Sequence, residues 1–113
     1  MRIIAGAYKG RTLKTVSGPG YRPAMGRVRE SLFSRLESRG VVWGECRVLD
    51  LFAGSGSLAF EALSRGAGQA VFVEQNESAI QIVRDNLKAT KLENNAVVMH
   101  CDALTALKRL EGK

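Results

Sequence analysis

The sequence has few of the residues that build metal centres and disulfide scaffolds. Its 113 residues include two cysteines and one histidine. Cys46 and Cys101 lie far apart, with no second cysteine close to either, so we expect no zinc finger, no CxxC redox pair and no Cys/His nucleophile. Each lies beside an apolar run, where a free thiol packs as a small hydrophobe. We therefore expect two reduced cysteines and no metal site.

Long apolar segments are also missing. No stretch approaches the roughly 18 consecutive apolar residues of a membrane span. The N-terminal apolar run is too short for a signal peptide. Aromatic residues make up only 6% of the chain, but hydrophobic residues make up 45%, which is enough for one packed core. These features predict a cytoplasmic protein of at most one domain, with no membrane partner.

Positive charge is concentrated in the first part of the chain. The net charge is +6; residues 1–47 hold ten Lys/Arg and three acids, whereas residues 48–113 hold seven Lys/Arg and eight acids. Such asymmetry is typical of a surface that faces a polyanion, and it fits a solvated basic face equally well. Charge alone leaves both interpretations open.

Two architectures follow one another along the chain. Residues 2–6 and 11–16 are strand-like and flank a glycine-containing turn, which predicts a β-hairpin. From residue 24 to 38, Met25, Val28, Leu32 and Leu36 recur at helical spacing. Residues 1–40 are therefore predicted to form a basic hairpin-plus-helix extension.

Residues 46–111 read as alternating strands and helices. The strand-like runs 47–52, 69–73 and 96–101 are nearly continuously apolar, as in a parallel sheet covered on both faces. Right-handed crossovers then give the strand order 3-2-1. We assign residues 41–113 to the first half of a doubly wound, Rossmann-like α/β domain.

A glycine loop joins the first of these strands to its helix. The segment Asp50-Leu51-Phe52-Ala53-Gly54-Ser55-Gly56 places two glycines where the backbone can turn tightly and approach a ligand. Glu74 ends the next strand, 20 residues after Gly54, where an acid can accept both ribose hydroxyls. The glycine pattern alone is weak, but together with Glu74 it predicts an adenosine cofactor.

Two more acids discriminate between cofactors. Asp50, four residues before Gly54, would repel a pyrophosphate but attract the sulfonium and amine of S-adenosylmethionine (SAM). Asp102 ends the third strand and can accept from an adenine amino group, although each acid could instead be a cap or a surface charge. The acids favour SAM over NAD. The predicted cofactor residues are Asp50, Phe52, Ala53, Gly54, Ser55, Gly56, Glu74, Gln75, Asp102 and Ala103.

These motifs resemble a known family. The segments 50–56, 61–67, 72–74 and 101–103 resemble a Rossmann-fold SAM-dependent methyltransferase. Arg2-Ile3-Ile4-Ala5-Gly6, Lys9-Gly10-Arg11 and Arg22-Pro23, with the segment 27–33, narrow the resemblance to the RsmD family of bacterial guanine-N2 methyltransferases of 16S ribosomal RNA. The resemblance covers essentially the whole chain and implies the small ribosomal subunit as partner. It also implies that basic residues contact RNA phosphates, namely Lys9, Arg11, Lys14, Arg22, Arg27 and Arg29. For Arg27 and Arg29, pairing with Glu30 or another acid is an equally good interpretation.

The resemblance also implies a motif that this sequence lacks. Methyltransferases of exocyclic amines share Asn/Asp-Pro-Pro-Phe/Tyr after a fourth strand, but the only prolines here are Pro19 and Pro23. We expect no catalytic residue in the chain, which would be a cofactor-binding part that can self-associate through the uncovered edge of its first strand. A DNA or other RNA amino-methyltransferase, or a non-catalytic RNA- or nucleotide-binding module, remains open. A nicotinamide dehydrogenase is a more distant alternative.

Overall fold

A three-stranded parallel sheet forms the centre of the molecule. The computed structural model describes residues 1–16 and 26–112. The strands are β1 (Arg47–Asp50), β2 (Gln69–Glu74) and β3 (Ala96–His100), with β2 in the middle. Both pairings are parallel, which confirms the predicted α/β class and the 3-2-1 strand order.

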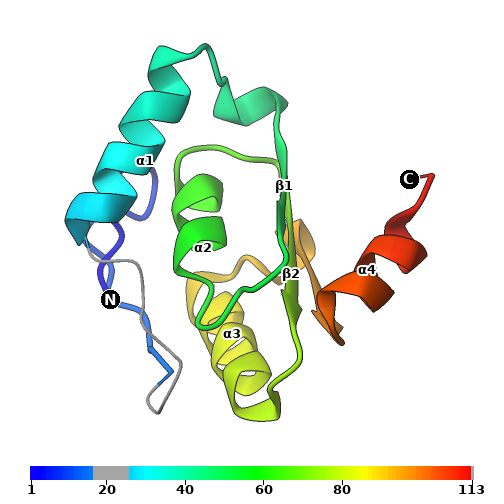
Figure 1. Cartoon of the computed structure of the whole chain (residues 1–113). Coiled ribbons are helices and arrows are strands. Elements are labelled where there is room, and N and C mark those ends of the chain that lie inside the picture. Colours follow the sequence, from blue (N-terminus) through cyan, green and yellow to red (C-terminus); the bar gives the residue numbers. More distant parts are fainter. Residues whose placement is uncertain (17–25, 113) are drawn as a thin grey trace.

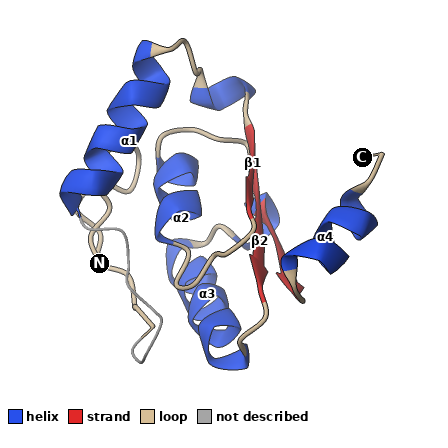
Figure 2. Ribbon diagram, viewed as in Figure 1, coloured by secondary structure: helices blue, strands red, loops and turns tan. Residues whose placement is uncertain are grey.

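Helices cover both faces of this sheet. The helices that connect the strands, α2 (Ser57–Ser64) and α3 (Glu77–Thr90), lie on one face, whereas α4 (Ala103–Leu110) lies on the other (Figure 1; Figure 2). The crossover rule explains this, because consecutive right-handed β-α-β connections in one direction place their helices on the same side. Helix α1 (Gly26–Ser38) lies outside α2, and short 3-10 turns precede β1 and β3.

The core lies between the sheet and the helices α2 and α3. Phe72 of β2 and Phe60 of α2 are fully buried, with ring centroids 5.0 Å apart. Val83 and Leu87 of α3 pack into the same cluster. The central strand is therefore fixed from the helical side, and the polar residues at its end have a rigid support.

The N-terminal hairpin is present in reduced form. A single antiparallel bridge joins Arg2 to Thr12, and the Ile3 N–H donates to the Arg11 carbonyl at 2.9 Å. Ile3 and Leu13 are buried in the core cluster. Burial of these two side chains, rather than a long strand ladder, holds the segment in place.

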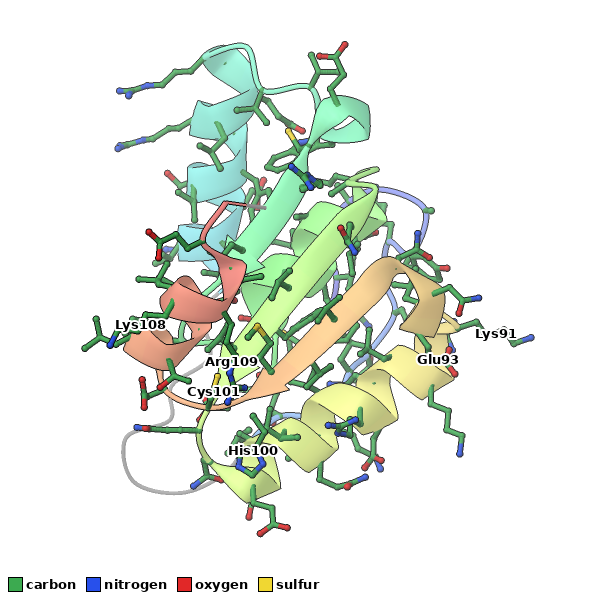
Figure 3. The ribbon with its side chains drawn as sticks, turned by 90° about the vertical axis from the view of Figure 1, so that its right-hand side faces the viewer. Lys91, Glu93, His100, Cys101, Lys108 and Arg109 are labelled. Carbon is green, nitrogen blue, oxygen red and sulfur yellow. The ribbon has the colours of Figure 1, made fainter. Side chains whose placement is uncertain are left out.

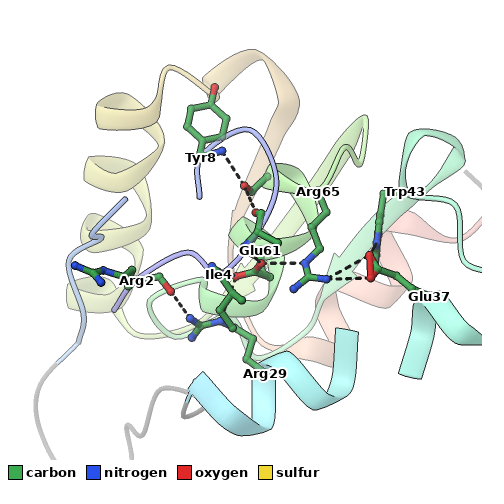
Figure 4. Close-up of polar contacts among 10 residues, drawn as sticks. Arg2, Ile4, Tyr8, Arg29, Glu37, Trp43, Glu61 and Arg65 are labelled. Atoms are coloured by element: carbon green, nitrogen blue, oxygen red, sulfur yellow. Dashed lines mark hydrogen bonds and ion pairs between the residues drawn. The ribbon is translucent and has the colours of Figure 1, made fainter. Parts of the chain in front are cut away.

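Glu61 of α2 anchors this N-terminal segment. Its side chain is completely buried, and its carboxylate accepts the backbone N–H groups of Ile4 at 2.9 Å and Ala5 at 3.0 Å (Figure 4). Arg29 of α1 and Arg65 donate from Nε at 3.3 and 2.9 Å. Four donors thus satisfy a charge that would otherwise be very costly to bury.

The predicted apolar face of α1 is not its buried face. Val28 and Leu32 are 61% and 40% exposed, whereas Arg29 and Phe33 are buried. Met25 lies outside the described residues. Periodicity identifies an amphipathic helix. Here, however, the side of α1 that carries Arg29 is buried, because Arg29 pairs with the Glu61 carboxylate.

Replacing the buried carboxylate should destabilise the chain strongly. The substitution Glu61→Gln keeps the size of the side chain but places an amide against two guanidinium groups. Breaking a buried ion pair costs about 3–5 kcal/mol, so we expect a loss of about 3 kcal/mol in the free energy of unfolding. Urea denaturation monitored by circular dichroism measures this loss.

Glu37→Gln is the matched control. Glu37 also pairs with Arg65, at 3.2 Å, but its side chain is 44% exposed. Water screens exposed ion pairs, so this variant should unfold near the wild-type midpoint. Equal midpoints for the two variants would show that Glu61 does not anchor the segment.

Candidate cofactor site

The carboxyl ends of the strands bring the predicted acids to one edge of the sheet. Asp50 is the last residue of β1 and Glu74 the last residue of β2. Parallel neighbouring strands end at the same edge, and ligands of open α/β sheets bind there. The structure therefore places Asp50 and Glu74 beside the glycine loop, as the sequence predicts.

Glu74 holds the glycine loop in shape. Its Oε1 accepts the Gly54 N–H at 3.0 Å, and its Oε2 accepts the Asn76 N–H at 2.8 Å. Asn76 in turn caps α3 by accepting the Ala79 N–H at 3.1 Å. One carboxylate therefore links the loop after β1 to the start of α3.

Gly56 is required by both backbone and packing. It has a φ of 87° and stands at the N-cap of α2. A Cβ at this position would lie 2.8 Å from the Phe72 ring and 2.9 Å from the Phe60 ring. Because Gly56 has no side chain, α2 can begin in direct contact with the core. The positive φ of Gly56 allows the turn between the loop and the helix.

Asp50 lies in a position that disfavours its own charge. Burial raises the pKa of its carboxyl group, and the nearby Glu74 carboxylate raises it further, while a hydrogen bond from the Phe52 N–H at 3.2 Å opposes the rise. Among the described residues no cationic side chain forms an ion pair with Asp50. A ligand that carries positive charge would supply the missing counter-charge.

Asp102 is engaged as a helix cap. Its Oδ1 accepts the Thr105 N–H at 2.8 Å and its Oδ2 accepts the Thr105 hydroxyl at 3.0 Å. These bonds lower the pKa of Asp102, because they stabilise the charged form. Asp102 is therefore the N-cap of α4, and the contact of Asp102 with adenine remains a prediction.

The other predicted cofactor residues differ in what they can offer. Phe52 is 81% exposed and Gln75 is exposed, so their side chains are accessible to a ligand. Ala53 and Ser55 are buried, and the Ala53 N–H donates to the Val73 carbonyl at 2.9 Å. Ala103, the first residue of α4, is half-buried. Phe52 and Gln75 are therefore the additional side chains best placed to touch a cofactor.

Most of the predicted RNA contacts are on the surface. Lys9 and Arg27 are exposed. Arg11 is also exposed and donates to the Ala89 carbonyl, while Lys14 pairs with Asp85 at 3.3 Å. Arg22 lies outside the described residues.

Arg29 does not belong to this set. It is 3% exposed, and its guanidinium group donates to Glu61 and to the Arg2 carbonyl. The prediction of a phosphate contact at Arg29 is wrong, because its buried guanidinium group already forms an ion pair with the carboxylate of Glu61.

Sequence reasoning missed two structural side chains. Glu61 was not predicted to have a role, although it is the only acid of α2. Asn86 was given no role, but it is 2% exposed, and its amide accepts the Lys14 N–H and donates to the Lys14 carbonyl. Its place three residues after Val83, on the apolar face of α3, was the available signal.

The described residues contain no group of three or more His, Cys, Asp or Glu arranged to hold a metal ion. Both cysteines are unbridged. Within residues 1–16 and 26–112 no helix is long and apolar enough to cross a membrane.

Comparison with known proteins gives consistent matches. The chain is 47% identical over 107 residues to the "Putative rRNA methyltransferase YlbH" of Bacillus subtilis, covering 95% of this chain and 56% of that protein. It is 43% identical over 107 residues to the "Ribosomal RNA small subunit methyltransferase D" of Escherichia coli K12, covering 95% of this chain and 52% of that one.

A solved structure agrees with these relatives. The "Putative methyltransferase yhhF" of Escherichia coli matches with a TM-score of 0.80 and 39% identity, covering 95% of this chain and 55% of that chain. The chain therefore spans a little over half the length of these relatives. The family model described as "Conserved hypothetical protein 95" matches residues 1–113, so the chain belongs to this family, and its resemblance to the RsmD-type methyltransferases is confirmed.

Proposed function

We propose that this chain is the SAM-binding part of a methyltransferase that modifies the exocyclic N2 amine of a guanine in small-subunit ribosomal RNA. The observation that carries the proposal is the carboxyl edge of the sheet. There, no cationic side chain of the described residues pairs with Asp50, and Glu74 shapes the glycine loop beside it. The relatives' names support the ribosomal RNA substrate, and a cytoplasmic location follows from such a substrate.

The chemistry of these groups fits SAM better than a dinucleotide. SAM supplies a methyl group on a positively charged sulfur, and it also carries an amine. Asp50 would stabilise that positive charge, whereas it would repel the pyrophosphate of NAD. Glu74 ends the neighbouring strand and carries carboxylate oxygens, the type of acceptor that ribose hydroxyls need. In this proposal Asp50 and Glu74 bind and orient the cofactor.

Binding the acceptor amine requires groups that this chain does not contain. The N2 amine of guanine has its lone pair delocalised into the ring, so acceptors must bind its hydrogens while it attacks the methyl carbon. Pro19 and Pro23 are not adjacent, so the sequence contains no Asn/Asp-Pro-Pro-Phe/Tyr motif. In this proposal the chain therefore binds the cofactor and contacts the RNA.

A second candidate function is that of a module that binds RNA or a nucleotide without transferring a methyl group. Methyl transfer from labelled SAM to small ribosomal subunits by the longer Bacillus subtilis relative, and its loss when the residue matching Asp50 is changed, would favour the enzyme. RNA binding without SAM affinity in this chain would favour the module.

SAM binding should depend on Asp50 and on pH. Because the pKa of Asp50 is raised, the carboxyl group keeps its proton to a higher pH than an ordinary aspartate and must lose it before it can pair with a cation. Affinity for SAM should therefore rise by up to about tenfold per pH unit below that pKa and level off above it. Asp50→Asn should weaken binding at pH 7 at least about tenfold and abolish the pH dependence. Isothermal titration calorimetry measures both effects.

The free energy of unfolding provides the control for Asp50→Asn. A carboxyl group with a raised pKa in the folded state destabilises the fold when ionised. That cost is absent below the ordinary pKa of 3.8 and complete above the raised value. Asp50→Asn should therefore raise the free energy of unfolding at pH 7, and the gain should vanish below pH 3.8. Unchanged SAM affinity in this folded variant would contradict the role of Asp50.

RNA binding should be sensitive to salt through the N-terminal part. Lys9 and Arg27 are exposed, and neither forms an ion pair with the described residues. If both contact phosphates, Lys9→Gln/Arg27→Gln should reduce the slope of log K against log salt by about 1.4 on single-stranded RNA. Filter binding across a salt series measures the slope. Lys108→Gln/Arg109→Gln on α4 removes the same charge and should leave the slope unchanged.

A further inference from the structure

Strand β3 presents an accessible edge on the side away from β2. None of its five residues is buried, whereas Ala70, Phe72 and Val73 of the neighbouring β2 are completely buried. In the described part of the chain no strand pairs with the outer edge of β3. Figure 3 shows this strand at the front of the molecule, between α3 and α4, with Glu93 near its start and His100 at its end. The outward backbone groups of β3 can therefore accept another strand.

The sequence of β3 does not protect this edge. Exposed edge strands usually carry Lys, Pro, an inward-pointing charge or a bulge, which prevent further strands from adding. The strand Ala96–His100 reads AVVMH and has no acidic residue, Lys, Arg, Gly or Pro. The opposite edge strand, β1, carries Arg47 and Asp50. The two edges of one sheet thus differ in the feature that controls strand addition.

A groove of about 310 Å³ runs beside this edge. Its apolar lining consists of Leu87, Ala96 and Val98. Arg84 and Lys88, one turn apart on α3, line it with positive charge. Both are exposed, and neither forms an ion pair with another described residue. Glu93 is the one acid among the residues that line the groove.

We propose that the outer edge of β3 binds an extended, acidic segment of a partner protein as an added strand. The backbone of the segment would pair with β3, and alternate side chains would enter the groove. An apolar side chain fits against Leu87 and Val98, and an acidic one lies within reach of Arg84 and Lys88. A nucleic acid would use the cations but cannot pair with the strand, so the uncharged, unpaired edge favours a peptide.

The proposal is independent of SAM binding, and a defined peptide tests it. The probe is a blocked hexapeptide, Val-Thr-Asp-Thr-Val-Thr, added to the 113-residue chain; its first, third and fifth side chains share one face, so that valine and aspartate can enter the groove together. Two further probes test charge and strand addition separately: one has lysine in place of aspartate, and one has proline in place of the second threonine. Amide hydrogen exchange followed by NMR shows where the probe binds.

We expect the acidic peptide to slow exchange of outward-facing amides in β3, and the lysine and proline probes to have no effect. Arg84→Glu/Lys88→Glu should weaken binding about tenfold, because two exposed attractions become repulsions. The control, Arg35→Glu/Arg39→Glu, makes the same charge change at the same spacing in and after α1 and should bind like the wild type.

Four results would overturn the proposal. They are binding without slowed exchange in β3, equal binding of the proline probe, equal loss in both charge variants, and protection of the same amides by an oligoribonucleotide. Sedimentation of the chain alone tests a second copy as the occupant: a dimer that protects β3 would also overturn the proposal. SAM affinity is measured on the same samples, so failure of the peptide with intact SAM binding rejects this inference alone.

Discussion

A buried carboxylate on α2, together with the burial of Ile3 and Leu13, holds the basic N-terminal segment in place. Glu61 has no exposed surface, and it gathers two backbone N–H groups and two guanidinium groups from elements far apart in sequence. A buried charge is tolerable only when its partners are complete, so these elements must assemble together. The hairpin has a single strand bridge and relies on this anchor for much of its order.

Glu74 acts in a comparable way at the carboxyl edge. It fixes the Gly54 amide and the start of α3, so the loop after β1 is shaped before any ligand arrives. Asp50 lies beside it with a raised pKa and without a cationic partner among the described residues. This preorganised negative site accounts for the proposed preference for a sulfonium cofactor.

The sequence predicted the sheet, its order and the edge where Asp50 and Glu74 lie, because these depend on local signals. Continuous apolar runs identify parallel strands, and Gly54 and Gly56 locate the turn that follows β1. The role of Arg29 could not be predicted, because its partner Glu61 is 32 residues away and nothing local distinguishes a buried arginine from an exposed one. The exposed side of α1 was unpredictable for the same reason.

The most direct test of the account is an NMR titration of the isotope-labelled chain with SAM and, separately, with NADH. If this edge of the sheet binds SAM, SAM should shift the amide signals of Gly54, Gly56 and Glu74, at the loop and strand end that meet there, while NADH should leave them unchanged. Shifts of these signals by NADH, or no change with SAM at a concentration that saturates a longer relative, would contradict it.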